Sequence, residues 1–373
     1  MKRIKLLYFS GSLIKGGAEK RTRNILTSLD KNIFQVYVGS FGMKASFDEY
    51  TNYGMTIINL GKRGMIPFFS LIRTLRLVNQ IKPDIMFSNL KRLNTLLLLL
   101  RMISPSIRTR IVITGISNNP RYHPNPAIAR FLYKRSEQLI AISYGIKHYL
   151  SREWSVKEKR IHVVHNGINI DKVVSLSKKD CSNEWFDGSK PVIITVGRLV
   201  RQKNHDYLIE SFAKLNHQIK SCLIIIGEGR RMRHLMDLVQ KFDLEEKVCF
   251  IGYQENPYKY IARADLFVLS SRWEGFGNVL IESMACNTPV ISTDIDFGPR
   301  EIIEHGVDGF LVPNEDSEIL TEQIKFVLDN RNRKYIEMII HNARMKVQKE
   351  FSSDLMVKKY QEYFLGVYNN NNR

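Results

Sequence analysis

Residues 274–282 read Glu-Gly-Phe-Gly-Asn-Val-Leu-Ile-Glu, and this stretch decides how the second half of the chain folds. Gly277 permits backbone geometry that a side chain would block. The apolar run at residues 279–285 then predicts a helix, whose first backbone N–H groups have no partners within the helix. Such N–H groups attract anions, because they lie at the positive end of the helix dipole. The stretch therefore predicts a loop that enters a helix at a phosphate-binding position.

Two carboxylates, Glu274 and Glu282, enclose this junction. If both were helical, the eight steps between them would place them about 80° apart around the axis, on different faces. We therefore expect Glu274 in the loop, near a hydroxyl-rich group, and Glu282 on the helix, near a second one. A sugar, a diphosphate and a ribose in series fit this layout, although two glutamates beside a helix are also commonly just solvated. Between the two glutamates, the residues expected to contact the same ligand are Phe276, Gly277, Asn278 and Val279.

The residues after this helix complete a recurring unit. Asn287-Thr288-Pro289 marks a turn, and residues 290–293 read as a buried strand that runs into Asp294. A helix, a turn and a strand in this order belong to a doubly wound α/β sheet, where ligands bind at the carboxyl ends of the strands. The expected fold class is therefore α/β.

Four motifs lie along the chain in a regular order. They are Gly16-Gly17-Ala18-Glu19, Asn166-Gly167-Ile168, Gly197-Arg198-Leu199 with Lys203-Asn204, and the stretch from Glu274 to Glu282. Together they resemble the retaining glycosyltransferases of family 4, and the resemblance covers nearly the whole chain. It implies a GT-B fold, with two Rossmann-like domains facing each other across a cleft and a C-terminal helix that returns to the first domain. It also implies transfer of a sugar from a nucleotide sugar with retention of configuration, without a metal or other cofactor.

The length and the strand pattern independently support two domains, because 373 residues exceed what one hydrophobic core usually spans. Short buried strands are expected in the first half at residues 4–9, 34–38, 84–87, 111–114, 138–143 and 161–164. The second half repeats the pattern at residues 191–196, 221–226, 247–251, 265–270 and 289–292. With the polar stretch 171–190 as a linker, we expect an acceptor-binding domain over residues 1–180, a nucleotide-sugar-binding domain over residues 187–350, and a helical tail over residues 351–373.

Charge is concentrated in the first half of the chain. Residues 1–186 hold 31 Lys and Arg against 11 Asp and Glu, whereas residues 187–373 hold 25 against 26, so the first half carries the whole net charge of +19. A basic domain attracts nucleic acid, an acidic membrane surface or a diphosphate-bearing acceptor. No nucleic-acid-binding motif accompanies the charge, so a nucleic-acid partner is not expected.

A membrane contact is expected to be peripheral. Residues 62–76 combine cations with bulky apolar residues, as in a helix lying in a membrane interface, although a packed helix with a basic outer face fits equally well. No apolar run reaches the roughly 20 residues that a span requires. Residues 1–9 turn polar at Ser10 and read as a strand rather than a signal peptide. The four cysteines have no metal spacing and suit the cytoplasm, the expected location.

Arg198 and Lys203 follow the strand that ends at Val196, where two cations can neutralise a departing diphosphate. The resemblance implies that they form the diphosphate clamp and that they act in catalysis with Glu274, whereas two exposed loop cations are the alternative. No strong nucleophile and base pair stands out, so we expect attack from the face that the leaving group vacates. The remaining expected donor contacts are Gly16, Gly17, Gly197 and Glu228, each also compatible with a plain turn.

The chain departs from the family pattern after the strand at residues 111–114, where many members carry a histidine. Here the sequence continues Gly115-Ile-Ser-Asn-Asn-Pro120, and the nearest histidine is His123. Asn118, Asn119 and His123 are therefore the candidates for contacts with the acceptor or the sugar.

The expected function follows from the motifs and the charge together. We expect transfer of a hexose or N-acetylhexosamine from a UDP-linked sugar donor. The expected acceptor is a glycan or a polyprenyl-diphosphate-linked acceptor in bacterial surface polysaccharide assembly. The alternatives are a sugar-nucleotide epimerase or hydrolase on the same fold, or a non-catalytic nucleic-acid-binding protein.

Overall fold

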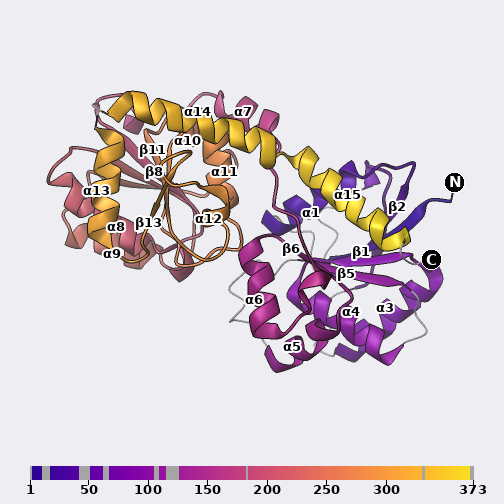
Figure 1. The fold of residues 1–373 in the computed structure, drawn as a ribbon. Coiled ribbons are helices and arrows are strands. Elements are labelled where there is room, and N and C mark those ends of the chain that lie inside the picture. Colours follow the sequence, from indigo (N-terminus) through magenta and orange to yellow (C-terminus); the bar gives the residue numbers. More distant parts are fainter. Residues whose placement is uncertain are drawn as a thin grey trace. The chain divides into compact units, whose positions relative to one another are not determined.

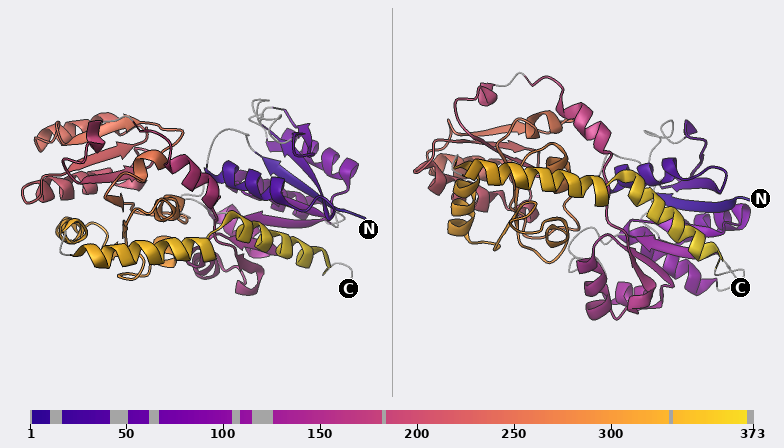
Figure 2. Two further views of the ribbon diagram at one scale, coloured as in Figure 1. Left: turned by 90° about the horizontal axis from the view of Figure 1, so that it is seen from above. Right: turned by 45° about the horizontal axis from the view of Figure 1, so that its top comes forward.

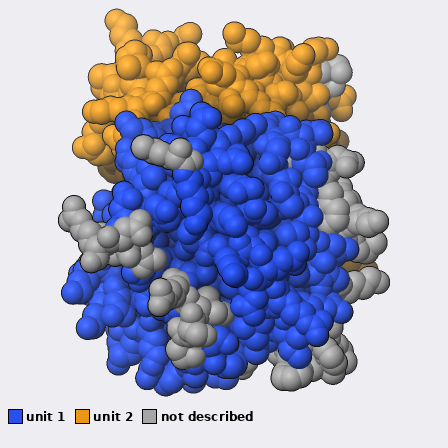
Figure 3. Space-filling view, turned by 90° about the vertical axis from the view of Figure 1, so that its right-hand side faces the viewer, with its two compact units in different colours: residues 1–166, 353–373 blue, residues 167–352 orange. Residues whose placement is uncertain are grey.

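The computed structural model describes residues 2–10, 17–41, 51–61, 67–104, 109–114, 126–181, 184–329 and 332–369 (Figure 1). The chain divides into two compact units, coloured separately in Figure 3. Unit 1 comprises residues 1–166 and 353–373, and unit 2 comprises residues 167–352. Each unit has its own parallel sheet and its own hydrophobic core.

The described strands of unit 1 form one parallel sheet in the order β3-β2-β1-β4-β5-β6-β7. Their bounds are β1 Ile4–Ser10, β2 Phe34–Ser40, β3 Thr56–Asn59, β4 Ile85–Ser88, β5 Arg110–Thr114, β6 Gln138–Ala141 and β7 Ile161–Val163. Strand β4 is buried at every residue, as expected for a strand that helices cover on both faces. The sequence analysis predicts all of these strands except β3, an edge strand of partly exposed residues without a continuous apolar run.

The described helices of unit 1 are α1 Gly17–Ser28, α3 Pro67–Ile81, α4 Lys91–Ile103, α5 Pro126–Arg135, α6 Tyr144–Trp154 and α15 Ser353–Asn369. Helix α15 is the last of the described helices and packs beside α1 (Figures 1 and 2). Met356, Tyr360 and Phe364 recur at four-residue steps on its buried face, and the Phe364 ring lies 5.4 Å from the ring of Phe87 in β4. The expected return of the C-terminal helix to the first domain is thus confirmed.

Unit 2 has a second parallel sheet, whose described strands follow the order β10-β9-β8-β11-β12-β13. Their bounds are β8 Val192–Val196, β9 Cys222–Ile226, β10 Val248–Gly252, β11 Leu266–Leu269, β12 Val290–Thr293 and β13 Phe310–Val312. This is the doubly wound order of a Rossmann-like sheet. The sequence analysis misses only β13, a three-residue strand at the edge.

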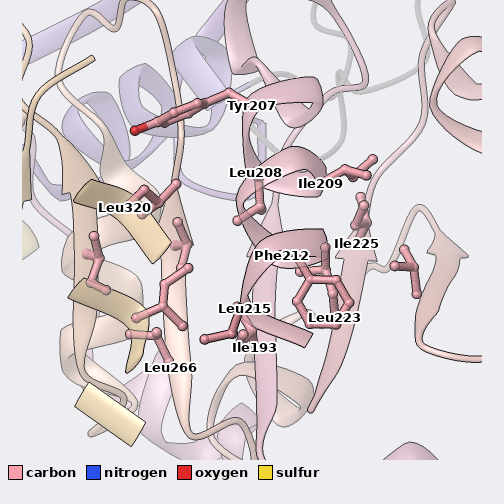
Figure 4. Packing of buried hydrophobic residues seen from close by; sticks show 14 of the residues in the cluster. Ile193, Tyr207, Leu208, Ile209, Phe212, Leu215, Leu223, Ile225, Leu266 and Leu320 are labelled. Atoms are coloured by element: carbon pink, nitrogen blue, oxygen red, sulfur yellow. The ribbon is translucent and has the colours of Figure 1, made fainter. Parts of the chain in front are cut away.

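The described helices of unit 2 are α7 Ile170–Ser177, α8 His205–Asn216, α9 Met232–Lys241, α10 Tyr258–Ile261, α11 Asn278–Ala285, α12 Pro299–Ile302, α13 Ser317–Leu328 and α14 Arg333–Glu350. Short 3₁₀ turns lie at Glu158–Arg160 (η2) in unit 1, and at Glu184–Phe186 (η3) and Arg201–Lys203 (η4) in unit 2. Figure 4 shows the core of unit 2, in which Phe212 of α8 packs beside Leu223 and Ile225 of β9.

The structure divides the chain earlier than the sequence analysis expects. The units separate between residues 166 and 167, and part of the expected linker forms α7, which packs against α10 and α11 of unit 2. The Asn169 side chain caps α7 by accepting a hydrogen bond from the Lys172 backbone N–H at 2.8 Å. Val173 is the buried anchor of this helix. The other apolar residues of this eight-residue helix, Ile170, Val174 and Leu176, are only partly buried, and mostly polar residues follow it up to Lys190, so the stretch resembles a linker.

Helix α3 contains the described part of the segment at residues 62–76, which the sequence analysis reads either as a membrane-interface helix or as a packed helix with a basic outer face. Leu77 and Val78 are buried, whereas Arg73 and Arg76 are exposed. Arg73 also donates to the Leu60 carbonyl at 2.8 Å. The described side chains of α3 therefore match a packed helix with a basic outer face. None of the described helices combines the length and the apolar character needed to cross a membrane.

Candidate active site

Strands β8 and β11 are neighbours at the point where the strand order of unit 2 reverses. Ligands of doubly wound sheets bind at the carboxyl ends of such strands. Two of the expected residues meet here, because the Lys203 ammonium lies 2.6 Å from Glu274 Oε1. Only 15% and 9% of these side chains are exposed. A shielded ion pair therefore joins the loop after β8 to the loop after β11.

Neighbouring residues hold this ion pair in place. Ser271 Oγ donates to the same oxygen of Glu274 at 2.7 Å. Gln202 Nε2 donates to the Trp273 carbonyl at 2.9 Å, which ties the two loops together a second time. Because Lys203 and Ser271 both use Oε1, the second carboxylate oxygen of Glu274 makes no hydrogen bond with any described residue. The carboxylate is thus oriented by the protein with one acceptor atom left over.

Glycines allow the loops at this edge to pack backbone against backbone. A Cβ on Gly227, whose φ is +141°, would lie 1.9 Å from the carbonyl oxygen of Gly197. A Cβ on Gly229 would lie 2.3 Å from the Leu199 carbonyl oxygen. The Leu199 N–H donates to the Glu228 carbonyl at 2.9 Å. The segment 227–229 therefore supports the loop after β8 by close packing.

Two of the expected charged residues lie on the surface of these loops. The side chains of Arg198 and Glu228 are exposed, and the Arg198 guanidinium makes no hydrogen bond or ion pair with any described residue. Gly197 lies against the aliphatic stem of Lys203, since a Cβ there would be 3.2 Å from Lys203 Cε. The structure thus places Arg198 and Lys203 in one loop but brings only Lys203 into contact with Glu274.

Helix α11 begins directly after Gly277, whose φ of +97° favours glycine. Asn278 and Val279 form the start of the helix, as the sequence predicts. Gly298, after β12, packs against the backbone of Phe276, because a Cβ on Gly298 would lie 1.9 Å from the Phe276 carbonyl oxygen. The N-terminus of α11 therefore lies at the same edge of the sheet as the ion pair.

Glu282 lies in the second turn of α11 and is half-buried. The Tyr258 hydroxyl donates to Glu282 Oε1 at 3.3 Å. Burial and the Glu282 charge raise the pKa of Tyr258 well above its ordinary value, so this hydroxyl remains a donor at neutral pH. Tyr258 therefore orients the Glu282 carboxylate from α10.

A further charged cluster lies beside Lys203. Burial, together with the Lys203 charge, lowers the pKa of His205 from 6.5 to about 4, so its imidazole is neutral. Asp206 pairs with Arg231 at 2.5 Å and also with His234. In the described part of the chain, no three His, Cys, Asp or Glu side chains come close enough to hold a metal ion.

The corresponding region of unit 1 contains a buried network of amide and hydroxyl groups. Tyr8 OH donates to Asn89 Oδ1 at 2.9 Å. Asn94 Nδ2 donates to the Thr114 carbonyl at 3.1 Å and to Tyr133 OH at 2.9 Å. The hydroxyl of Ser88, the last residue of β4, also donates to Asn94 Oδ1, so the Asn94 side chain connects the ends of β4 and β5 through neutral groups.

The motif at residues 16–19 lies only partly in the described structure, whereas the motif at residues 166–168 is fully described and spans the boundary between the units. Gly17 is the first residue of α1, and Asn166 Oδ1 accepts a hydrogen bond from the buried Arg21 at 2.8 Å. The other candidates of this unit, Gly16, Asn118, Asn119 and His123, lie outside the described residues.

The sequence analysis does not identify three residues that support the site: Gln202, Ser271 and Tyr258. Ser271 has the only usable signal, since a hydroxyl at the carboxyl end of a strand near a candidate carboxylate is a plausible orienting group. Gln202 and Tyr258 belong to no motif, and their partners are distant in sequence.

Two family models match the chain. The model described as Glycosyltransferase Family 4 matches residues 15–172, and the model described as Glycosyl transferases group 1 matches residues 178–346. The first match covers most of unit 1, and the second covers most of unit 2 with the ion pair and α11.

Full-length relatives agree with these matches. A Campylobacter jejuni protein named N-acetylgalactosamine-N,N'-diacetylbacillosaminyl-diphospho-undecaprenol 4-alpha-N-acetylgalactosaminyltransferase is 29% identical over 97% of this chain and 100% of its own. The amylovoran biosynthesis glycosyltransferase AmsD of Erwinia amylovora is 24% identical, over 96% and 99%.

The fold also matches a solved structure. The crystal structure of HepE from Anabaena in complex with UDP superposes with a TM-score of 0.81 at 20% identity, over 98% of this chain and 100% of that one. This likeness shows the fold, which is GT-B with two Rossmann-like domains. The first half of the chain matches one glycosyltransferase model and the second half matches the other, and the protein therefore belongs to the family 4 glycosyltransferases.

Proposed function

We propose that this glycosyltransferase moves a hexose or N-acetylhexosamine from a UDP-linked donor, with retention of configuration and without a metal or cofactor. The observation that carries the proposal is the Lys203–Glu274 ion pair at the switch point of unit 2, beside the N-terminus of α11. A cation and helix N–H groups suit a diphosphate, and an oriented carboxylate suits a sugar hydroxyl.

In this mechanism the bond between the anomeric carbon and the diphosphate oxygen breaks, and its electron pair leaves with the nucleotide. The acceptor hydroxyl attacks from the same face and transfers its proton to a phosphate oxygen. Arg198, Lys203 and the backbone at Phe276 to Val279 stabilise the growing charge. Lys203 can serve both partners, because an ammonium group has three donors and Glu274 uses one.

Recognition of the donor is divided between the two glutamates. The second oxygen of Glu274 accepts a hydrogen bond from a sugar hydroxyl, while Glu282 accepts from the ribose. The orienting bonds from Ser271 and Tyr258 support these roles, since a fixed acceptor loses less freedom on binding. Gly197 and Glu228 contribute the remaining contacts of this loop.

For the acceptor we propose a glycan or a polyprenyl-diphosphate-linked glycan in bacterial surface polysaccharide assembly, with peripheral contact between unit 1 and an anionic membrane on the cytoplasmic side. The Campylobacter relative is named for an undecaprenyl-diphosphate-linked acceptor, and AmsD for amylovoran. The charge of unit 1 is consistent with such partners, since it holds 31 Lys and Arg against 10 Asp and Glu.

The decisive experiment measures free nucleotide released from a panel of UDP- and GDP-sugars, with a Glu282→Ala control. Selective release from one UDP-sugar, lost in the control, is the expected result. If no donor is hydrolysed, calorimetry with each nucleotide sugar separates strict dependence on an acceptor from absence of donor binding, which would refute the proposal. NMR of the transferred sugar tests retention, and addition of EDTA tests metal independence.

Removal of Arg198 or Lys203 probes the leaving-group role directly. Each Ala variant should lower kcat by about 10²-fold, the scale for loss of one charge-stabilising donor. Lys220→Ala, an exposed site in the same unit, is the matched control and should retain full activity. Unchanged kcat in Lys203→Ala would exclude the proposed role of the ion pair.

A further inference from the structure

A basic groove of about 750 Å³ lies on unit 1, where α5, the end of α6 and η2 meet. Its lining holds five cations and one carboxylate: Arg130, Lys134, Arg135, Lys157, Arg160 and Glu153. Helices of a parallel α/β sheet run opposite to the strands, so the carboxyl ends of these helices lie at the amino edge of the sheet. The groove therefore lies at the edge opposite to the one where ligands of such sheets bind.

Two of these cations have local structural roles. Arg160 donates to the carbonyl oxygens of Lys134 and Ser136, at 3.5 and 3.3 Å, and so completes the end of α5. Arg135 donates to the Phe131 carbonyl at 3.1 Å, and its guanidinium lies 3.6 Å from the centre of the Phe131 ring. Helix capping accounts for both of these side chains.

Capping does not account for Arg130, Lys134 and Lys157. All three side chains are exposed, and none of these side chains makes a hydrogen bond or ion pair with any described residue. Arg130 lies more than a turn before the end of α5, and Lys157 lies outside a helix. Three free cations thus project from two elements at one groove.

Exposed apolar side chains accompany these cations. Ile128 and Phe131, one turn apart on α5, are 51% and 46% exposed. The opposite face of the helix packs against the interior of unit 1, since Ala129 and Leu132 are buried. The outer face of α5 therefore combines apolar and cationic groups, the pattern of a helix that rests on a membrane.

We propose that this groove, defined by Arg130, Phe131, Lys134 and Lys157 with Ile128 beside it, docks unit 1 on a membrane surface of anionic lipid headgroups. The inference deepens the proposed membrane contact and rests on that part of the proposed function, but not on the identity of the donor. On this proposal the groove, and not the segment at α3, is the surface of unit 1 that contacts the membrane. Free cations from two elements match several headgroups better than one phosphate, and nucleic acid would leave the two apolar side chains without a partner.

The test is flotation of the full chain with phosphatidylcholine vesicles, with and without phosphatidylglycerol. The groove variant is Arg130→Glu/Lys134→Glu/Lys157→Glu. The matched control, Lys2→Glu/Lys31→Glu/Arg76→Glu, changes the net charge equally at other exposed sites of unit 1 and includes α3. Nucleotide binding should be equal in all three proteins, which controls for folding, because none of these residues belongs to the donor site.

We expect the wild type to float only with anionic vesicles. Each surface cation changes the partition by about fivefold, so the groove variant should bind about 10²-fold more weakly than the control. Ile128→Ser should lower vesicle binding severalfold without changing retention on DNA. This variant separates a membrane from a soluble polyanion.

Three results would overturn the proposal. Equal losses in the groove variant and the control would show that overall charge, and not this groove, drives binding. Unchanged vesicle binding in Ile128→Ser, with loss of DNA retention in the groove variant, would assign the groove to a polyanion. A wild type that binds nucleotide but never floats would remove the membrane contact while leaving the transferase proposal intact.

Discussion

The two units have the same doubly wound sheet, but different groups hold their carboxyl edges together. In unit 2 the loops are joined by an ion pair and by glycines that bring backbone against backbone. In unit 1 the described contacts at this edge include a network of buried amide, hydroxyl and backbone carbonyl groups, and no ion pair joins the residues of this network. The units also differ in charge, with 31 Lys and Arg against 10 Asp and Glu in unit 1 and 25 against 27 in unit 2. The fold fixes where the carboxyl edge of each sheet lies, and the residues of the loops at that edge determine its chemistry.

The backbone packing of unit 2 provides the largest expected effect. Gly227→Ala should destabilise unit 2 by at least about 3 kcal/mol, because the new Cβ would overlap the Gly197 carbonyl. Gly188→Ala is the matched control: its φ of +79° is also positive, but a Cβ there meets no atom within 4 Å. That control should cost about 1 kcal/mol, because an L-residue with a Cβ is strained at positive φ. Denaturant unfolding measures both, and equal costs would mean that backbone strain alone matters.

Acid should weaken unit 2 through His205. Its folded pKa of about 4 lies below the ordinary 6.5, so the unfolded chain takes up the proton first as the pH falls. The stabilising contribution is complete above pH 6.5 and is lost toward pH 4, by up to about 3 kcal/mol. His205→Gln should flatten this part of the stability profile. A slope unchanged in that variant would assign the acid sensitivity to other groups, such as Asp206.

The neutral network of unit 1 should respond to loss of Asn94. Asn94→Ala leaves the Thr114 carbonyl and the Tyr133 hydroxyl without this donor and should cost about 2 kcal/mol. Asn79→Ala, at an exposed position of α3, should be nearly neutral. Hydrogen exchange should show faster opening in β4 and β5 but not in β8 or β11. Equal changes in both sheets would contradict separate stabilisation of the two edges.

The smallest effect concerns the orientation of Glu282. Tyr258→Phe removes the hydrogen bond to this carboxylate and should weaken UDP binding about fivefold, or about 1 kcal/mol. Binding of 2′-deoxy-UDP should change less if the lost contact is with the ribose. Tyr260→Phe, on the same helix, removes only a bond to Gln254 and serves as the control. If Tyr258→Phe weakens the binding of UDP and of 2′-deoxy-UDP equally, Tyr258 does not act through recognition of the ribose.

Much of the fold is predictable because its signals are local. Runs such as residues 222–226 are buried on both faces of a parallel sheet and are apolar throughout, so they read as strands without further information. Edge strands lack this signal: β3 is partly exposed and β13 has three residues, and both are missed. Helix α7 is missed because it has only eight residues, of which Val173 alone is fully buried, and because the stretch after it is polar.

The sequence by itself determined the α/β class, the two domains, the family and the loop-to-helix stretch at residues 274–282, because repeated apolar periods and glycine-containing motifs are written in consecutive residues. Only the tertiary structure decided which of these residues meet. Lys203 and Glu274 are 71 positions apart and form a pair because β8 and β11 are neighbours in the sheet. Tyr258 reaches Glu282 because α10 packs on α11. Such contacts depend on the order of strands and the packing of helices, which no local pattern contains.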